Sequence, residues 1–335
     1  MQLRVISLGV LPPELLHKTY MGLAEAQKDD DPPVLLLVQS EPHLSLGAAQ
    51  SASAELDHRA CANLGIPVLQ RALGGGLVWV DSGQLNYFFI FPMALGIRRG
   101  PELFARTAPW IVALHARFGL QIEARDGHDF WCASQKIGGT GAATIGRSLV
   151  MGGSLMLHVD WKPFVNCVAA PSAGFRAWLA EALQDSLWTW SRLLPQVPSV
   201  EDIRNTFPEV LESGDIQVTR VATLKPAEQQ AVTAAELEEP EWEMPASRRV
   251  PAGIKIKAGA FLTERQWPDG SWLRIWTENG GFRKVAASVW SENQCRVFTG
   301  LRAESQEMTR ALQELAGEAC AQWSARFAET AVWKD

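Results

Sequence analysis

The stretch Arg71-Ala72-Leu73-Gly74-Gly75-Gly76-Leu77-Val78 places three consecutive glycines between two strand-like runs. Glycine tolerates positive φ and lets other groups come close to the backbone, so a triple glycine between strands indicates either a tight turn or a place where a ligand touches the backbone. The glycines alone leave both alternatives open, and a plain turn is the simpler one. A phosphate-binding P-loop is excluded, because the G-x-x-x-x-G-K-S/T spacing is absent and no helical pattern follows.

Two later stretches combine glycines with side chains that could carry chemistry. Lys136-Ile137-Gly138-Gly139-Thr140-Gly141 places a lysine at the head of a predicted glycine turn, seven residues after Asp129. Backbone N–H groups and an ammonium at such a turn can together hold an anion, although a lone lysine is more often a solvated surface charge. The other stretch runs from Gly152 to Asp160, opening with two glycines and continuing with the alternation of a strand.

Around these stretches, strand-like runs alternate with helical patterns. β-rich apolar runs predict four strands, at residues 34–38, 65–71, 77–80 and 85–91. The turn signal Asp81-Ser82-Gly83 predicts a hairpin between the last two strands. Apolar side chains at three- and four-residue steps predict helices over 102–118 and 175–194. The predicted fold class is therefore α+β, a mixed sheet with helices packed on it.

A change of composition sets a second region apart. Residues 225–252 are rich in glutamate and punctuated by prolines, which is typical of a linker or exposed loop. We therefore predict a first domain over residues 1–224, a linker over 225–252 and a small α+β domain over 253–335. Turn signals in this last segment separate three strand-like runs, at residues 261–263, 272–276 and 285–290. A long final helix is predicted to carry an apolar stripe from Met308 to Phe327.

The composition excludes several classes of protein. The 335 residues are 47% apolar and 20% charged, with a net charge of −6, which is typical of a soluble globular protein. The absence of basic runs argues against nucleic acid as a partner. The longest apolar stretch is too short to cross a bilayer and the first residues lack a secretion-signal pattern, so we expect a cytoplasmic protein with no membrane partner. Five scattered cysteines without a C-x-x-C pair argue against zinc and disulfides.

Taken in order and at this spacing, the glycine stretches and their neighbours resemble the lipoate–protein ligase family, a branch of the biotin/lipoyl ligase and octanoyltransferase superfamily. That family's pattern begins with Arg-Arg, a Gly-Gly-Gly turn, Val, an aromatic residue, His-Asp and Gly-Asn-Leu-Asn. The corresponding residues here are Arg71 to Gly76, Val78 to Asp81 and Gly83 to Asn86. The opening of the chain, from Leu8 to Gln50, also fits the family.

The resemblance continues through the second half of the chain. The family's Asn-Asp, Lys-Ile-Gly-Gly and His-Gly-Ser/Thr-Leu elements correspond to His128-Asp129, Lys136 to Gly139 and Gly152 to Leu155. The segment Lys255 to Thr263, with the glycine-turn hairpin after it, resembles the small accessory domain of many lipoate ligases. The resemblance therefore implies a catalytic domain of the class II aminoacyl-tRNA synthetase and biotin ligase type, followed by an accessory domain.

The activity implied by the resemblance is acyl activation. Lipoate or octanoate would react with Mg-ATP to give an acyl-adenylate, which is then passed to a lysine of a lipoyl-carrier domain. Lys136 is the implied catalytic residue, because a cation beside the carboxylate and the α-phosphate stabilises the negative charge that develops there. Asp129 is the implied protein ligand of magnesium or of the nucleotide.

The resemblance also implies a set of binding residues. They are Arg71, Gly74, Gly75, Gly76, Trp79, Asn86, Asp129, Gly138, Gly139, Thr140, Gly153 and Ser154. The planar fork of Arg71 would clamp phosphate or carboxylate oxygens, and the triple glycine would let the backbone close on the adenylate. Trp79 and the strand around Tyr87 are candidates for an apolar acyl tunnel, although core packing explains them equally well.

The chain departs from the family pattern at several positions. Gln70 and Ala72 flank Arg71, so the second arginine is absent; Leu73 replaces a Ser or Thr; Val80 and Gly152 each replace a His. These losses raise the possibility of a shifted substrate pose or of a weak or inactive enzyme. The lysine and glycine frame survives, so we expect a working but divergent ligase.

Two alternatives stay open. One is an ATP-independent octanoyl or lipoyl transferase, in which the thiolate of Cys167 is the nucleophile and Lys136 lowers its pKa. Cys167 lacks the proline-cysteine-glycine context of such transferases, and a buried structural cysteine is the competing interpretation. The other alternative is a non-catalytic protein that binds lipoate or its carrier without activating it. A biotin ligase is disfavoured, because residues 71–76 lack a Gly-Arg-Gly-Arg-like run.

Overall fold

The computed structural model describes residues 1–243, 248, 250–302 and 305–333. Within these residues the chain forms two compact units, each assembled from separate stretches of sequence. The first unit contains Met1–Ala52, His58–Phe164 and Leu187–Glu243, and the second contains Ser53–Asp57, Val165–Ser186 and the described residues after Glu243. Both units combine helices with a sheet, so the predicted α+β fold class is confirmed.

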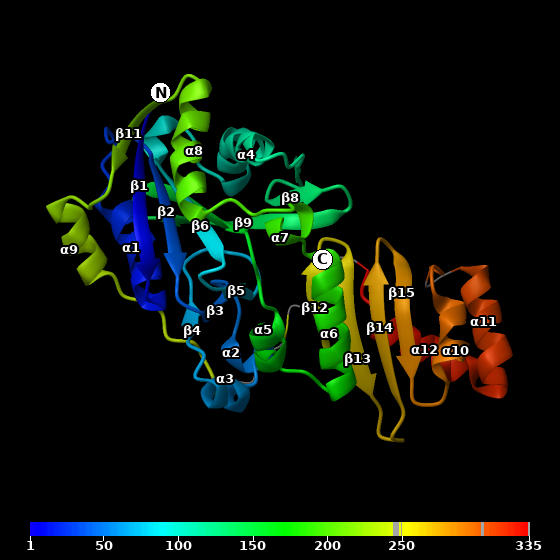
Figure 1. The fold of residues 1–335 in the computed structure, drawn as a ribbon. Helices are drawn as coiled ribbons and strands as arrows, with labels where there is room; N and C mark the ends of the chain where they lie inside the picture. The colour runs from blue at the N-terminus through cyan, green and yellow to red at the C-terminus, as the bar shows by residue number, and fades with distance from the viewer. Residues whose placement is uncertain (244–247, 249, 303–304, 334–335) are drawn as a thin grey trace. The chain divides into compact units, whose positions relative to one another are not determined.

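The first unit is built on an eight-stranded mixed sheet with the order β11-β1-β2-β6-β10-β9-β8-β7 (Figure 1). The strands are β1 (Gln2–Leu11), β2 (Val34–Ser40), β6 (Gln84–Pro92), β7 (Glu123–Arg125), β8 (Asp129–Cys132), β9 (Gln135–Ile145), β10 (Ser148–Met156) and β11 (Gln217–Val221). β1 runs parallel to both of its neighbours, and the other pairs are antiparallel. A separate three-stranded sheet has the order β4 (Val68–Gln70), β3 (His43–Leu46) and β5 (Val78–Val80). The triple glycine lies in the loop that joins β4 to β5 along the chain.

Helices cover both faces of the large sheet. α1 (Pro13–Ala26) packs on one face, which we call the α1 face, and α4 (Gly100–Arg117) and α8 (Val200–Ser213) pack on the other, the α4 face (Figure 1). α9 (Pro226–Ala234) lies against α1. The short helices are α3 (His58–Leu64), η1 (Met93–Leu95) and α7 (Trp190–Leu193), with α2 (Ala52–Glu55) and α5 (Lys162–Cys167) where the chain passes between units.

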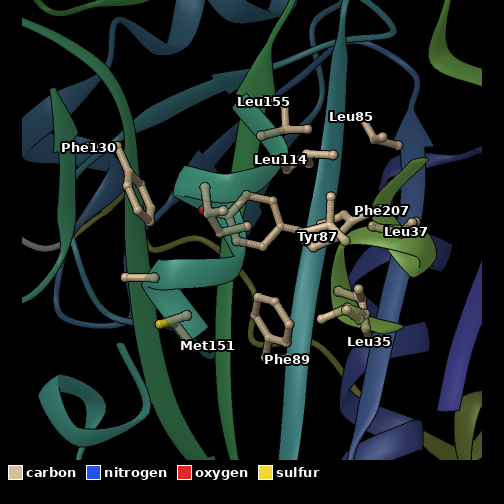
Figure 2. Packing of buried hydrophobic residues seen from close by; sticks show 14 of the residues in the cluster. Leu35, Leu37, Leu85, Tyr87, Phe89, Leu114, Phe130, Met151, Leu155 and Phe207 are labelled. Carbon is tan, nitrogen blue, oxygen red and sulfur yellow. The ribbon is translucent and has the colours of Figure 1, made fainter. Parts of the chain in front are cut away.

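The central strands are apolar over most of their length, because helices cover both of their faces. Leu35 and Leu37 of β2, with Tyr87 and Phe89 of β6, point to the α4 face and pack with Phe207 of α8 (Figure 2). The residues that alternate with them point the other way and pack beneath α1. A strand buried on both faces needs a continuous apolar run rather than alternation, and this is why 34–38 and 85–91 are so strongly apolar.

The second unit has its own antiparallel sheet and core. Its sheet has the order β12 (Gly253–Lys257), β13 (Ala260–Gln266), β14 (Trp272–Glu278) and β15 (Gly281–Ala287). The helices are α6 (Ala173–Ser186), α10 (Glu292–Cys295), η2 (Arg296–Phe298), α11 (Gln306–Ala316), η3 (Gly317–Ala319) and α12 (Cys320–Thr330). α6 contacts β12 and β13, whereas α11 and α12 close an apolar cluster with Ile275 and Phe282.

The hairpin predicted across residues 81–83 is wrong. β5 pairs with β3, whereas β6 pairs with β2 and β10 at the centre of the large sheet. The apolar side chains of β6 require cover on both faces, which a two-stranded hairpin could not provide. The glycine turn predicted after Lys136 is wrong as well, because residues 138–141 lie inside β9.

Two predicted helices prove to be broken. The pattern over 175–194 is split between α6, which ends at Ser186, and α7, which begins at Trp190; between them Leu187 bridges to Lys136. The apolar period runs on because α6 packs in the second unit while Trp190 is buried in the core of the first. The final helix is interrupted at Gly317, whose φ of +52° ends α11, and both halves of the predicted stripe still face one core.

The stretch predicted as a linker contains ordered structure. α9 lies within it, and Trp242 stacks on His58 with ring centroids 4.4 Å apart. Residues 244–247 and 249 of the predicted linker lie outside the described residues, so the three-part division of the chain stays a prediction. Among the described helices, none combines the length and the hydrophobicity needed to span a bilayer.

The two-sided burial of the central strands can be tested with Leu37→Ala. Leu37 is fully buried on the α4 face, so the substitution leaves a cavity and should lower the free energy of unfolding by about 2–5 kcal/mol. Urea denaturation monitored by tryptophan fluorescence measures this loss. Val10→Ala in β1, where the side chain is 51% exposed, is the control and should change stability by less than about 1 kcal/mol. Equal losses in the two variants would contradict the proposed core.

Candidate active site

A row of polar side chains crosses the α1 face of the large sheet. Tyr87 points into the α4-face core, so the neighbouring Asn86 points to the α1 face. Ser154 of β10 is the direct cross-strand partner of Asn86 and shares its face. Phe130 of β8 also packs on the α4 face, and this directs the carboxylate of Asp129 to the same side as Asn86. Three strands thus bring predicted site residues to one face.

Lys136 and Asp129 form an ion pair in this row. The Lys136 Nζ lies 2.7 Å from the Asp129 Oδ1. The Asp129 side chain is only 2% exposed and the Lys136 side chain 23%, so the carboxylate is held in place while part of the ammonium stays accessible. A Cβ at Gly139 would lie 2.7 Å from the Nζ, so glycine at this position leaves the room that the ammonium occupies. The arrangement presents a fixed cation at the sheet surface.

Asn86 contributes an unsatisfied donor. Its residue is 5% exposed, and its Nδ2 has no hydrogen-bond partner within the described residues. A buried amide donor without a partner is costly, so such a group is expected to bond a ligand or an ordered water. Asn86 is therefore equipped to donate to an anionic or carbonyl oxygen bound over this row.

A hydrogen-bonded chain connects the row to β5. The Ser154 hydroxyl donates to the Gln84 Oε1 at 3.0 Å, and the Gln84 Nε2 donates to the Trp79 carbonyl at 3.0 Å. The Trp79 indole N–H donates to the Asp81 carboxylate at 2.8 Å. Trp79 is 5% exposed, and these bonds fix its ring through its polar edge. Sequence reasoning had not assigned a role to Gln84 or Asp81, whose contribution depends on contacts between two sheets.

Arg71 holds the glycine loop between β4 and β5. Its Nη2 donates to the carbonyl oxygens of Gly74 at 3.1 Å and Gly76 at 2.6 Å, and its Nη1 donates to the Ser45 carbonyl at 2.7 Å. Burial lowers the pKa of the Arg71 guanidinium to about 10, so it stays charged at neutral pH. Gly75 has a φ of +101°, a conformation that favours glycine. The Arg71 guanidinium thus fixes the conformation of the loop through hydrogen bonds to its carbonyl oxygens.

The loop lies across the sheet next to the lysine. The Gly74 N–H donates to the Ala142 carbonyl of β9 at 3.3 Å, and a Cβ at Gly141 would collide with the Gly74 carbonyl oxygen. On β9, Gly141 follows Gly139 by two residues and so lies on the same face, about 7 Å further along the strand. The glycine loop and the Lys136 ammonium are therefore neighbours on the α1 face.

Four of the predicted residues point to the opposite face. A Cβ at Gly138 would contact the Phe130 ring, and one at Gly153 would collide with the Tyr87 hydroxyl, so both directions lead to the α4-face core. The Thr140 hydroxyl donates to the His128 carbonyl at 3.0 Å. Tyr87 itself is fully buried in that core (Figure 2). These four residues therefore face away from the row that contains Lys136.

Cys167, the alternative nucleophile, is the last residue of α5 and is fully buried within the second unit. Its backbone carbonyl accepts the Asp57 N–H at 2.8 Å. A thiol that is closed to solvent cannot meet an incoming acyl group without local opening, so its surroundings are those of a structural cysteine.

The structure adds a buried polar chain that sequence reasoning missed. The His43 Nδ1 donates to the Glu41 carbonyl at 2.9 Å, so its Nε2 is the acceptor that faces the His17 Nε2 at 3.3 Å. The His17 Nδ1 then accepts from the Tyr20 hydroxyl at 3.4 Å, and that hydroxyl accepts the N–H of Ala72 in the glycine loop. One sequence feature could have indicated this polar chain: His17 lies on the apolar stripe of α1, three residues before Tyr20.

This chain predicts a pH-dependent stability. Burial lowers the pKa of His43 to about 4, and burial together with His43 and Arg71 lowers the pKa of His17 well below its usual value. Both are neutral in the folded state and bind protons near pH 6.5 when unfolded, so the unfolded state gains protons first as the pH falls. The free energy of unfolding should drop from pH 6.5 toward pH 4, by up to about 3 kcal/mol for His43.

Urea denaturation across that pH range measures the loss. His43→Gln removes one of the titrating groups and should flatten the pH profile, whereas His158→Gln, at an exposed position, should leave its slope unchanged. A profile that is as steep in His43→Gln as in the wild type would contradict a neutral buried histidine.

The geometry agrees with one protein family. The lipoyl protein ligase A/B catalytic domain matches residues 17–212, more than half of the chain, and the chain therefore belongs to this family. The matched range contains the glycine loop, the polar row and the Lys136–Asp129 pair. It ends within α8 of the first unit.

Individual relatives support the same assignment. The chain is 34% identical over 136 residues to a lipoate–protein ligase of Streptococcus pyogenes serotype M5 (strain Manfredo), an alignment that covers 40% of this chain but only 38% of that protein. Two solved structures share the fold at 18% identity. One is a bipartite lipoate protein ligase studied with its E2 lipoyl domain from Thermoplasma acidophilum (TM-score 0.60, 69% of this chain and 91% of the other). The other is a lipoate-protein ligase A bound with ATP (TM-score 0.58, 70% and 93%).

Proposed function

We propose that this chain is an ATP-dependent lipoate–protein ligase that activates lipoate or octanoate and transfers it to a lysine of a lipoyl-carrier domain. The observation that carries the proposal is the Lys136 ammonium, held by Asp129 on the same sheet face as Asn86, Ser154 and the glycine loop. Family membership, and the names of relatives that bind ATP or are paired with a lipoyl domain, support the same choice.

In the first step, a carboxylate oxygen of the acyl substrate attacks the α-phosphorus of ATP. The bond from that phosphorus to the bridging oxygen breaks and pyrophosphate leaves, giving the acyl-adenylate. Negative charge gathers on the carboxylate and α-phosphate oxygens, and the Lys136 ammonium stabilises it in a partly water-excluded position. The Asn86 Nδ2, which has no partner among the residues that the structure describes, donates to one of these oxygens. The glycine loop lies against the adenylate through its backbone.

In the second step, the ε-amine of the carrier lysine attacks the acyl carbonyl carbon. The acyl–phosphate bond breaks, AMP leaves, and the proton lost by the amine passes to solvent. Lys136 balances negative charge in both steps and takes no part in proton transfer. Asp129 positions Lys136 through their ion pair.

The proposed reaction uses magnesium, and few protein side chains would coordinate it. Within the described residues, no three His, Cys, Asp or Glu side chains converge as a metal site would require. Magnesium commonly keeps several waters and binds through one or two carboxylates plus the phosphates of its substrate. Asp129 is the carboxylate in the polar row that could serve as the protein ligand, and the metal would supply further charge neutralisation to the phosphates.

The test is the mass of a purified lipoyl-carrier domain after incubation with this protein, acyl substrate and Mg-ATP. The wild type should add one acyl group only when ATP is present. Lys136→Ala should lower the rate by on the order of 10²–10³, because the main cation of the site is lost. Lys162→Ala, at an exposed lysine, and Cys167→Ser, at a buried position, should retain the activity if both variants remain folded.

Other outcomes would replace this function. Transfer from an octanoylated carrier without ATP, lost in Cys167→Ser, would establish the transferase alternative. Tight lipoate binding without pyrophosphate release would instead establish a non-catalytic binding protein.

A further inference from the structure

The single proton of the Ser154 hydroxyl is committed within the protein. The Ser154 Oγ donates to the Gln84 Oε1 at 3.0 Å. The orientation of the Gln84 amide is fixed from its other end, because its Nε2 donates to the Trp79 carbonyl at 3.0 Å and lies 3.4 Å from the Asp81 Oδ1. A carbonyl and a carboxylate oxygen only accept, so the Nε2 faces them and the Oε1 faces Ser154. Gln84 is 2% exposed, so water does not compete for these bonds.

A hydroxyl whose proton is committed can only accept a further hydrogen bond. The Ser154 oxygen keeps lone pairs for this purpose, and the residue is half-buried, so a ligand group can reach it. Asn86 lies directly across from Ser154 on the same face, and its Nδ2 is a donor left without a protein partner in the described part of the chain. The two strands therefore present one acceptor and one donor side by side, with Cβ atoms about 5 Å apart.

The substrates of the proposed ligase, on which this inference rests, differ in what they can donate. The acyl carboxylate and the triphosphate are ionised at neutral pH and only accept, so they suit Lys136 and Asn86 but not the Ser154 oxygen. The donors are the ε-amine of the carrier lysine and the ribose hydroxyls and base amino group of the nucleotide. Position favours the amine, because it must approach the acyl carbonyl carbon beside the groups that bind the carbonyl and phosphate oxygens. Ser154 is one cross-strand spacing from Asn86, which is one of those groups.

We propose that Ser154, oriented by Gln84, accepts a hydrogen bond from the ε-amine of the carrier lysine as that amine attacks the acyl-adenylate. The nitrogen bonds to the acyl carbon, the acyl–phosphate bond breaks, AMP leaves, and the proton lost by the nitrogen passes to solvent. The nitrogen gains positive charge during the attack, so its N–H becomes a stronger donor and the bond to Ser154 strengthens toward the transition state. Ser154 thus lowers the barrier to transfer, and Gln84 is a positioning residue that acts through Ser154.

The experiment separates the two steps of the reaction. Pyrophosphate formation from octanoate and Mg-ATP measures activation, and single-turnover transfer from preformed octanoyl-adenylate to a purified lipoyl-carrier domain measures the attack of the amine. Ser154→Ala should lower the maximal rate of transfer about 3–10-fold more than it lowers pyrophosphate formation, the effect expected of one lost hydrogen bond. The carrier concentration at half-maximal rate should change less than the maximal rate, because the bond is strongest in the transition state.

Two further serine variants distinguish the hydroxyl from the fold. Ser154→Thr keeps a hydroxyl on a residue that is well suited to a strand, so it should transfer faster than Ser154→Ala. Ser213→Ala, at the exposed end of α8, is the matched control and should leave both rates unchanged.

Gln84→Met tests the positioning residue. Its side chain has a similar length but no acceptor, so the Ser154 proton is no longer committed. The variant should slow transfer more than activation, and the double variant of Ser154→Ala and Gln84→Met should be no slower than the slower single variant. Additive losses would overturn the action of Gln84 through Ser154. Urea denaturation checks that each variant is folded, and if Gln84→Met is not, Ser154→Ala and Ser154→Thr still decide the role of Ser154.

The outcomes separate the inference from the function beneath it. Equal losses in the two assays for Ser154→Ala, or no loss, overturn the role of Ser154 while ATP-dependent lipoylation keeps the ligase. Deoxyribose analogues of ATP and inosine triphosphate test the nucleotide as the donor. If one of them slows activation in the wild type but not in Ser154→Ala, the donor belongs to the nucleotide and the inference is overturned. Ser154-dependent transfer from octanoyl-adenylate without pyrophosphate formation supports the inference and rejects the ligase, whereas activity in neither assay overturns both.

Discussion

The burial of the central strands on both faces is the constraint on which the rest of the first unit depends. Because side chains alternate along a strand, every residue of β6 and β10 is assigned either to the α4 face or to the α1 face. On the α4 face the assignment is apolar along the whole of β6. On the α1 face the same strand changes from Phe88 and Ile90, beneath α1, to the polar Gln84 and Asn86. The candidate site begins where that change occurs.

Glycine at three sheet positions then determines what can approach this face. Gly139 leaves room for the Lys136 ammonium, Gly141 for the carbonyl of Gly74, and Gly152 for the side chains of Leu73 and Phe88. These glycines lie in extended strands and not in turns. Their role is therefore to leave room for neighbouring groups, and not to adopt unusual backbone angles. Arg71 acts from the other side, since its guanidinium bonds the loop carbonyls. A cation expected to bind a substrate directly also shapes the loop that would cover it.

Sequence patterns predicted the fold class well, because it depends on local signals. Continuous apolar runs identified 34–38 and 85–91 as strands. The resemblance to a known family selected Lys136, Asp129, Asn86 and Ser154, and the structure brings these four residues to one face of the sheet. The failures share one cause, which is partner choice over long sequence separations. The turn at 81–83 joins strands of two different sheets, and the apolar period over 175–194 spans two units that each bury part of it. The His17–His43 contact joins a helix to a distant strand and has no local signature.

Long-range packing also determines which side chains fit beside the glycine loop. A Cβ at Gly152 would lie 2.7 Å from the Phe88 ring and 2.8 Å from the Leu73 Cδ1, so a larger side chain at position 152 would meet hydrocarbon. A polar side chain there would also be buried without a hydrogen-bond partner, which is costly. If Leu73 were a serine while position 152 stayed glycine, the space above the sheet would be left partly empty, and packed interiors resist such voids. The side chain of Leu73 and the glycine at position 152 therefore fit together as a pair. Leu73, Val80 and Phe88 belong to one apolar cluster with Leu16 and Tyr20 of α1, so the start of the glycine loop is held against the sheet by hydrocarbon contacts.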